Sequence, residues 1–453
     1  MISRLSSAAD SMQGILHGAD RTFDGVSTDT RTLKSGELFF ALSGPNFDGG
    51  EFVPQASDKG AAGAVVAAKV SSDLAQIAVD DTRLALGRLG AAWRQQYAAM
   101  VVAVTGSNGK TTLKEMIAVC LTQSAPTIAT DGNLNNDIGM PLMLLRMDAS
   151  HRFAVLEMGA NHAGEIAYLT SLAQPEVVVI TNAGAAHLEG FGSVSGVAHG
   201  KGEILQGEPR PRYAILNADD EFYSYWRSLV DDIEVLSFGL DDGADIYATA
   251  VQTGKAASTF RLHLPAVELD INLPLVGLHN ISNACAAAAV AVALGISGAQ
   301  IKTALESIAP VAGRLQAING MHGATLYDDS YNANPVSVQA AGEFLAALAG
   351  RNWMVLGDMG ELGSDAEALH RHAGENLRAS GIDRLFATGE LSRATVAAFG
   401  DGAKWFAGID ELTAGLAGEL AADVNVLIKG SRAARMERVV DAVRAPRAMR
   451  KEA

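Results

Sequence analysis

A glycine-rich loop in the segment VVAVTGSNGKTT carries the residue types of a phosphate-binding site. Its members are Gly106, Ser107, Asn108, Gly109, Lys110, Thr111 and Thr112. In such a loop the backbone amides and the start of the next helix surround an anion, the lysine reaches the β- and γ-phosphates, and a threonine hydroxyl binds magnesium. The general spacing G-x-x-x-x-G-K-[ST] would place a glycine at position 104, where this chain has Val104. Because the strand-to-helix context is present, the loop is still predicted to bind nucleotide phosphates.

Two further side chains are expected at the same edge of the sheet as the loop. Glu157 ends the apolar run FAVLE, and His187 follows the apolar run VVVIT after a short connection. The carboxyl ends of parallel strands meet at one edge, so a carboxylate and an imidazole there could complete a magnesium site. Alone, Glu157 would be a surface glutamate and His187 a hydrogen-bonded loop histidine. Beside the phosphate loop, both are predicted to be metal ligands.

Polar residues that could bind the rest of a nucleotide follow later in the chain. His279, Asn280 and Asn283 lie at the start of a helix. Asparagine amides suit the edge of an adenine ring, although Asn280 or Ser282 could instead cap the helix. Arg314 could stabilise phosphate charge, and an aspartate after the next strand could bind ribose hydroxyls. That strand, in the segment TLYDDSYNANP, is followed by Asp328, Asp329, Tyr331 and Asn332.

The elements that would position these residues fall into three segments. Residues 1–98 contain short strand-like pieces and a helical pattern over 82–98, which indicates a small α/β domain. Residues 99–312 hold the apolar runs VVAVT, FAVLEM, VVVIT, YAILN and LPLVGL, which predict buried parallel strands. Residues 313–453 repeat this pattern with WMVLGDM, RLFATG and VNVLIKGS, and so predict a second open parallel sheet. A cleft between the last two domains would suit a nucleotide and a second substrate.

Composition restricts the class of protein. The 453 residues have a net charge of -16, and the basic stretch RAPRAMRK near the end is short, so no nucleic-acid partner is expected. No apolar run reaches the length of a membrane span or a signal peptide, so no membrane insertion is expected. The two cysteines, Cys120 and Cys285, lie in apolar helical stretches and are predicted to be reduced core residues of a cytoplasmic protein.

These motifs resemble those of the Mur ligases, which join amino acids or peptides to a UDP-N-acetylmuramoyl carrier. The loop GSNGKTT resembles the family's shorter form G-x-x-G-K-[ST], with Gly106 as its first glycine. LEMG, NAGAAHL, HNISN and the pair Gly313-Arg314 occur in the family's order along nearly the whole chain. The resemblance implies three α/β domains: an N-terminal uridine-nucleotide module, a central P-loop ATPase-like parallel sheet and a C-terminal Rossmann-like domain.

Within the family, the segments GNLNNDIGMPLMLL, DDSYNANP, LGDMGELG and VLIKGSR resemble the member that adds D-alanyl-D-alanine to UDP-N-acetylmuramoyl-tripeptide. No D-N-P-R stretch, typical of the diaminopimelate-adding relative, is present. The implied reaction uses ATP to convert the tripeptide carboxylate to an acyl phosphate, which the dipeptide amine then attacks. The alternatives are the diamino-acid-adding relative and a nucleotide-gated ATPase or motor protein.

The resemblance also implies roles for single residues. ATP and two Mg²⁺ ions are the implied cofactors, and Thr111, Glu157, His187 and Lys201 would serve the metal ions. Lys201, which by itself would be a solvated side chain, matches a lysine that is carbamylated in several members. Asn280, Arg314 and Asp329 match nucleotide-contacting positions, and a monomer is expected. The carrier and dipeptide would lie near Ser27, Thr28, Arg31, Asn133, Asn135, Asn136, Tyr331 and Asn332.

Overall fold

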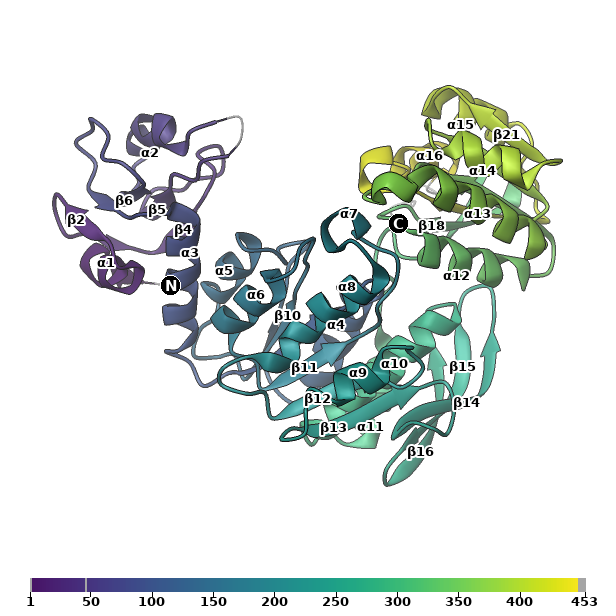
Figure 1. Ribbon diagram of the computed structural model, residues 1–453, viewed down its shortest axis with the longest axis horizontal. Coiled ribbons are helices and arrows are strands. Elements are labelled where there is room, and N and C mark those ends of the chain that lie inside the picture. Colours follow the sequence, from purple (N-terminus) through teal and green to yellow (C-terminus); the bar gives the residue numbers. More distant parts are fainter. Residues whose placement is uncertain (1, 45–46, 447–453) are drawn as a thin grey trace, which may run out of the picture.

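The computed structural model describes residues 2–44 and 47–446, so most of the basic C-terminal stretch lies outside the described residues. Three large sheets follow one another along the chain, and each belongs to one α/β domain. Figure 1 shows the N-terminal and C-terminal domains as the two arms of a U whose base is the central domain. None of the helices described has the length and apolar character that a membrane crossing requires. The three-domain α/β fold predicted above is confirmed, whereas the boundaries at residues 98/99 and 312/313 stay predictions.

The N-terminal domain has a five-stranded sheet in the order β2-β7-β6-β5-β4, in which only the β2–β7 pair is antiparallel. A short antiparallel ribbon of β1 and β3 lies beside it. The strands are β1 (Ser3–Arg4), β2 (Ile15–His17), β3 (Thr22–Phe23), β4 (Gly25–Ser27), β5 (Glu37–Phe40), β6 (Gly63–Val66) and β7 (Gln76–Ala78). The helices are α1 (Leu5–Met12), α2 (Val53–Asp58) and α3 (Thr82–Arg94).

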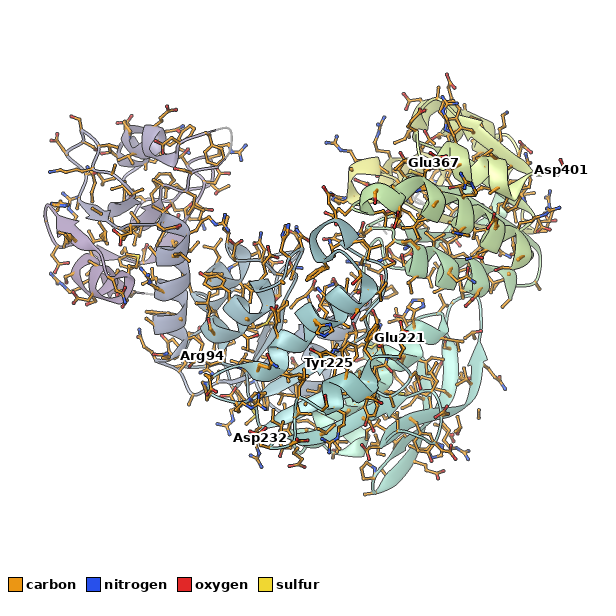
Figure 2. The ribbon with its side chains drawn as sticks, in the orientation of Figure 1. Arg94, Glu221, Tyr225, Asp232, Glu367 and Asp401 are labelled. Atoms are coloured by element: carbon orange, nitrogen blue, oxygen red, sulfur yellow. The ribbon has the colours of Figure 1, made fainter. Side chains whose placement is uncertain are left out.

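Helix α3 joins this domain to the central one. It ends at Arg94, earlier than the predicted residue 98, where the amide of Tyr97 closes a turn on the Arg94 carbonyl. The buried Arg94 guanidinium donates to the Ala173 carbonyl at 2.9 Å and to the Glu176 carboxylate at 3.0 Å. Figure 2 marks Arg94 at this joint. Because these acceptors belong to the central domain, α3 is fixed at its C-terminal end.

The central sheet has nine strands in the order β16-β15-β14-β13-β12-β11-β8-β10-β9. It is parallel from β9 to β14, and the β14, β15 and β16 pairings are antiparallel. The prediction that LPLVGL forms a strand is wrong: β16 ends at Leu273, Pro274 has no amide to donate, and Gly277 has φ +89°. The strands are β8 (Met100–Thr105), β9 (Thr127–Ala129), β10 (Phe153–Glu157), β11 (Val177–Ile180), β12 (Tyr213–Asn217), β13 (Glu234–Gly239), β14 (Ile246–Thr253), β15 (Ser258–Leu264) and β16 (Val267–Leu273).

Helices cover both faces of this sheet, which explains why its parallel strands are continuously apolar. Val102 and Val104 of β8 face the cluster formed with α4, α10 and α11, whereas Val101 and Ala103 face α5, α6 and α8. The helices are α4 (Lys110–Thr122), α5 (Gly139–Leu144), α6 (Glu165–Ala173), α7 (Leu188–Phe191), α8 (Val194–Gly202), α9 (Tyr223–Arg227), α10 (Leu278–Ala293) and α11 (Gly298–Ser307).

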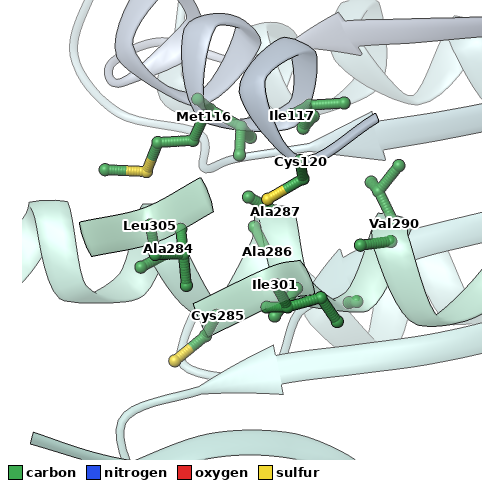
Figure 3. Close-up of a cluster of buried hydrophobic side chains, with 14 of the residues drawn as sticks. Met116, Ile117, Cys120, Ala284, Cys285, Ala286, Ala287, Val290, Ile301 and Leu305 are labelled. Atoms are coloured by element: carbon green, nitrogen blue, oxygen red, sulfur yellow. The ribbon is translucent and has the colours of Figure 1, made fainter. Parts of the chain in front are cut away.

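Both cysteines lie in the first of these clusters, as predicted. Figure 3 shows Cys120 of α4 and Cys285 of α10 among apolar side chains. Both thiols are unpaired, and burial raises the pKa of Cys120 to about 12. The thiols therefore stay protonated and act as small apolar side chains.

The C-terminal domain has a six-stranded sheet in the order β17-β18-β22-β19-β20-β21, with only β17 antiparallel. The predicted strands in this region are present, and β17 and β21 are added to them at the two edges. The strands are β17 (Gln316–Asn319), β18 (Thr325–Asp329), β19 (Arg351–Leu356), β20 (Arg384–Thr388), β21 (Ala403–Phe406) and β22 (Val424–Lys429). The helices are α12 (Pro335–Ala346), α13 (Ala366–Ala379), α14 (Ser392–Phe399), α15 (Ile409–Ala417) and α16 (Glu437–Val443).

Candidate functional site

The glycine-rich loop connects β8 to α4 in a conformation that its two glycines permit. Gly106 has φ +144° and Gly109 has φ +84°. A Cβ atom at position 106 would lie 1.8 Å from the Thr181 hydroxyl oxygen, so no other residue fits there. Gly109 precedes α4 without any side-chain cap, which leaves the first amides of the helix free for an anion.

Residues 181 and 182, directly after β11, form hydrogen bonds with the loop. The Ser107 amide donates to the Asn182 carbonyl at 3.0 Å, and the Asn108 amide donates to the Asn182 side-chain oxygen at 2.9 Å. The Thr181 hydroxyl donates to the Asn108 carbonyl at 2.7 Å. Thr181 and Asn182 were not predicted as site residues, although the position directly after an apolar strand was a usable signal.

Lys110 folds back over the loop. Its Nζ donates to the Gly106 carbonyl at 2.6 Å and lies 3.4 Å from the Ser107 carbonyl. Loss of solvent lowers the pKa of Lys110; the Glu157 carboxylate opposes this shift and Arg314 adds to it. An anion bound in the loop would therefore stabilise the charged form of Lys110, whose hydrogen-bond partners among the described residues are backbone carbonyls.

Glu157, at the end of β10, presents a carboxylate oxygen with no partner. The residue is buried, and its Oε1 accepts a hydrogen bond from the Asn135 amide at 2.7 Å. Its Oε2 is buried without a hydrogen-bond partner. A buried carboxylate oxygen in this state is costly unless a cation or a donor reaches it. The observation therefore fits the predicted metal-ligand role.

His187 and Lys201, the other two predicted metal ligands that follow Glu157 in the chain, differ in their burial and in their contacts. His187 has φ +55°, and its Nδ1 lies 2.5 Å from the Glu361 Oε2 of the C-terminal domain, outside hydrogen-bond geometry. Lys201 is 1% exposed, and its Nζ lies 3.4 Å from the Ala160 carbonyl. Burial, followed by repulsion from Lys110, lowers the pKa of Lys201 to about 7. The expectation of a solvated lysine is wrong.

No group of three His, Cys, Asp or Glu side chains within residues 2–44 and 47–446 could hold a metal ion by itself. Mg²⁺ is usually bound by one or two carboxylates together with substrate phosphates and water. The residues present fit that mode, because Glu157, whose Oε2 has no hydrogen-bond partner, lines the same cavity as Thr111.

A cavity of about 900 Å³ joins these residues to the C-terminal domain. The Arg314 guanidinium lies 3.9 Å from the Tyr331 ring centre and donates to the Thr111 hydroxyl at 3.2 Å. The predicted site residues in its lining are Ser107, Asn108, Gly109, Lys110, Thr111, Thr112, Asn133, Asn135, Asn136, Glu157, His187, Asn280, Asn283, Arg314, Asp329, Tyr331 and Asn332.

The predicted residues outside this lining lie in two places. Gly106 is the first residue of the loop and packs against Thr181, and Lys201 is buried in α8. Ser27 ends β4 in the N-terminal domain, and Thr28 and Arg31 follow it; their role at a uridine nucleotide stays a prediction. There Arg31 pairs with Asp29 at 2.7 Å, and hydrogen bonds from Arg31 lower the pKa of Asp29 to about 2.

The start of α10 does not use asparagine as a cap. Its N-cap is Gly277, without a side-chain hydrogen bond, so the capping alternative is wrong. Asn280 donates to the Val276 carbonyl at 2.8 Å, and a Cβ atom at Gly109 would lie 2.8 Å from the Asn283 side-chain oxygen. Asn283 therefore packs directly against the phosphate loop.

Lys429 and Asn334 are among the cavity residues of the C-terminal domain that were not predicted. Lys429, buried at the end of β22, donates to Asp329 at 2.6 Å and to the Asn332 carbonyl at 2.9 Å. Asn334 caps α12 and donates to the Asn108 side chain at 2.8 Å. The strand end in VNVLIK was a signal for Lys429, whereas nothing local marks Asn334 as a partner of the loop.

Replacing Gly106 by alanine is expected to destabilise the protein by more than about 1–3 kcal/mol and to weaken nucleotide binding. The added methyl group would collide with Thr181 and displace the loop. Gly400→Ala is the matched control, because Gly400 has φ +77° with no atom within 4 Å of its Cβ position. Thermal unfolding and ADP titration measure both effects. A smaller loss for Gly106→Ala than for Gly400→Ala would contradict the steric explanation.

Comparison with known proteins adds a full-length match. Profiles of the Mur ligase family catalytic domain, the Mur ligase middle domain and the Mur ligase glutamate ligase domain match residues 22–94, 104–291 and 313–432. The UDP-N-acetylmuramoyl-tripeptide–D-alanyl-D-alanine ligase of Escherichia coli K12 is 45% identical, covering 97% of this chain and 98% of that protein.

Two solved structures agree with this match. A crystal structure of MurF from Acinetobacter baumannii is 37% identical, with a TM-score of 0.92 over 97% of this chain and 98% of that one. MurF ligase from Thermotoga maritima in complex with ADP is 27% identical, with a TM-score of 0.84 over 92% and 96% of the two chains.

Proposed function

The chain belongs to the Mur ligase family, and from this premise we propose that it joins D-alanyl-D-alanine to UDP-N-acetylmuramoyl-tripeptide at the expense of ATP. The observation that carries the proposal is the cavity between two domains. Lys110 and Glu157 line it from the central domain, and Arg314 and Asp329 line it from the other side. The 45% identity with a ligase of this name supports the choice of substrates.

The reaction must activate a carboxylate. Direct attack of an amine on a carboxylate would have to expel an oxide ion, which is a very poor leaving group. The terminal carboxylate of the tripeptide therefore first attacks the γ-phosphorus of ATP, releasing ADP and forming an acyl phosphate. The amine of D-alanyl-D-alanine then attacks the acyl carbon, and phosphate leaves as the amide forms. Catalysis depends on positioning and charge neutralisation rather than on a covalent enzyme nucleophile.

The charges that this step needs are supplied from both domains. The loop of residues 106–112 holds the ATP phosphates through its amides, and Lys110 neutralises the β/γ end. Arg314, already within hydrogen-bond distance of Thr111, adds a second cation at the same place. Asn280, Asn283 and Asp329 bind the remainder of the nucleotide.

Two Mg²⁺ ions are held by Thr111, Glu157, His187 and Lys201, the last as a carbamate. When bound, Mg²⁺ supplies charge neutralisation at the phosphates and the developing acyl phosphate. The unpaired Glu157 oxygen supports this assignment. For Lys201, a pKa of about 7 supports carbamylation, because only the neutral amine reacts with carbon dioxide.

The carrier is bound by the N-terminal domain through Ser27, Thr28 and Arg31 and extends to the cavity past Asn133, Asn135 and Asn136. Tyr331 and Asn332 lie on the dipeptide side. We place the monomeric enzyme in the cytoplasm, where ATP is available and Cys120 and Cys285 stay reduced.

A ligation assay distinguishes this function from its alternatives. With ATP, Mg²⁺ and UDP-N-acetylmuramoyl-tripeptide containing either meso-diaminopimelate or lysine, D-alanyl-D-alanine is expected to give the pentapeptide product. Meso-diaminopimelate or lysine offered to the matching dipeptide carrier is expected to give none, and their use would identify the diamino-acid-adding relative. Strong phosphate release without carrier and acceptor would instead favour an ATPase or motor protein.

A further inference from the structure

One contact joins the C-terminal domain to the proposed metal ligand His187. The Glu361 Oε2 lies 2.5 Å from the His187 Nδ1. His187 lines the cavity, and its Nδ1 atom is buried. Glu361 lies between β19 and α13, so the two side chains come from different domains. A protein carboxylate thus lies against one ring nitrogen of the histidine, at ion-pair distance although outside hydrogen-bond geometry, and Nε2 is the nitrogen left to coordinate a cation.

The segment that carries Glu361 is fixed by its own domain. The Met359 amide donates to His370 Nε2 at 3.0 Å, and the Gly357 amide donates to the Lys429 carbonyl at 2.9 Å. The Asp358 carboxylate accepts from the Ser392 amide at 2.8 Å. The backbone that leads to Glu361 is therefore anchored in the C-terminal domain.

The same segment also touches the helix that follows His187. The Glu189 amide of α7 lies 3.5 Å from the Glu361 carbonyl, and a Cβ atom at Gly363 would meet the Glu189 Cα at 3.6 Å. Glu361 itself has φ +59°, a left-handed conformation that turns the chain toward α7. The contact with His187 is thus part of a small surface between the domains.

We propose that Glu361 is a positioning residue that orients His187 for the metal ion from across the domain interface. A carboxylate this close to Nδ1 favours the ring proton on that nitrogen by its charge and leaves the Nε2 lone pair for the cation. The inference rests on the proposed role of His187 as a metal ligand. Because Glu361 belongs to the C-terminal domain, the metal site is complete only when that domain lies against α7.

Cation affinity of the full-length protein tests the proposal without measuring turnover. Mn²⁺ binding to the ADP complex is followed by electron paramagnetic resonance for wild type, Glu361→Ala, Glu361→Gln and His187→Gln. Loss of an outer partner typically weakens metal binding about 10-fold or more, so Glu361→Ala is expected to raise the Mn²⁺ Kd by about that factor. Glu361→Gln keeps an oxygen that accepts from Nδ1–H and is expected to stay within about threefold of wild type. Glu411→Ala, at an exposed position of α15, is the matched control.

The double variant separates the inference from the function on which it rests. If Glu361 acts through His187, adding Glu361→Ala to His187→Gln produces no further loss. A further loss, an unchanged or tighter Mn²⁺ Kd in Glu361→Ala, or an equal loss in Glu361→Gln, would overturn the positioning role. If His187→Gln itself leaves the Mn²⁺ Kd unchanged, the metal-ligand assignment fails instead.

Discussion

Replacing Lys110 by methionine is expected to lower kcat for ligation by about a thousandfold while the fold persists. A preorganised charge at a reacting group typically contributes a factor of about 10²–10³ or more. The position of Lys110 suits this role, since its Nζ donates to the Gly106 carbonyl of the loop at 2.6 Å. Methionine has a similar length and no charge, so the loop loses its cation and little packing.

The lowered pKa of Lys110 explains why its removal should raise the free energy of the transition state more than that of the ATP complex. Loss of solvent lowers the pKa of Lys110, so the surrounding protein does not by itself stabilise the charged form of this lysine. Negative charge on the transferring phosphoryl group supplies the missing partner. We therefore expect kcat to fall more than the apparent affinity for ATP.

Steady-state kinetics at saturating carrier and D-alanyl-D-alanine measure this effect, with circular dichroism as the test of folding. Lys69→Met, which removes an exposed lysine of the N-terminal domain, is the control for a lost surface charge. Turnover of Lys110→Met within tenfold of wild type would remove Lys110 from the mechanism.

The local parts of the site could be predicted from the sequence, because each depends on one strand and the turn after it. The phosphate loop and Glu157 belong to this class: an apolar run gives the strand, and the next polar residue lies at the sheet edge. The shorter G-x-x-G-K-T spacing is compatible with this function, because the backbone at Gly106 and Gly109 provides the required conformation.

The contacts between domains could not be predicted in this way. Asn334 and Asn108 are 226 residues apart in the chain, and Lys429 and Asp329 are 100 apart. Each member has an ordinary local interpretation, as a helix cap or as a charged residue after a strand. Their pairing depends on how two sheets are placed relative to each other, which no local pattern contains.

The antiparallel strands β14, β15 and β16 of the central sheet were not predicted, although their sequence contains a weaker signal. In β15 the residues of STFRLHL alternate between buried and exposed over its first five positions, which is the period of a half-buried strand. A continuous apolar run predicted a strand at LPLVGL instead, where Pro274 and Gly277 prevent one. Alternation is the appropriate signal for the antiparallel part of a mixed sheet.

Replacing Lys201 by methionine is expected to abolish ligation and, at the same time, to stabilise the fold at pH 6.5 by on the order of 2 kcal/mol. Lys201 is 1% exposed, and among the described residues its Nζ contacts the Ala160 carbonyl at 3.4 Å and the Phe191 ring at 5.2 Å, while Glu165 and Glu203 act on it only through their charge. These partners do not compensate a buried ammonium group. Methionine fills similar space without the charge, but it cannot form a carbamate for the metal ion.

The pH dependence of this gain follows from the pKa of about 7 in the folded protein, against 10.5 for an ordinary lysine. Between these values the unfolded chain binds more protons, so the stability of the wild type rises with pH across this window. The penalty is complete below pH 7 and absent above pH 10.5. The advantage of Lys201→Met should therefore shrink as pH rises from 7 toward 10.5.

Thermal unfolding of wild type and Lys201→Met from pH 6.5 to 9.5 measures the difference in stability. The buffer is free of carbon dioxide, because carbamylation would convert the Lys201 amine to a carbamate. Ligation by the wild type is expected to rise when bicarbonate is added at pH 8, with no response in the methionine variant. A methionine variant less stable than wild type at pH 6.5 would show that Lys201 stabilises the fold. A loss of stability there would refute the view that this lysine is kept, at a cost to folding, for the reaction.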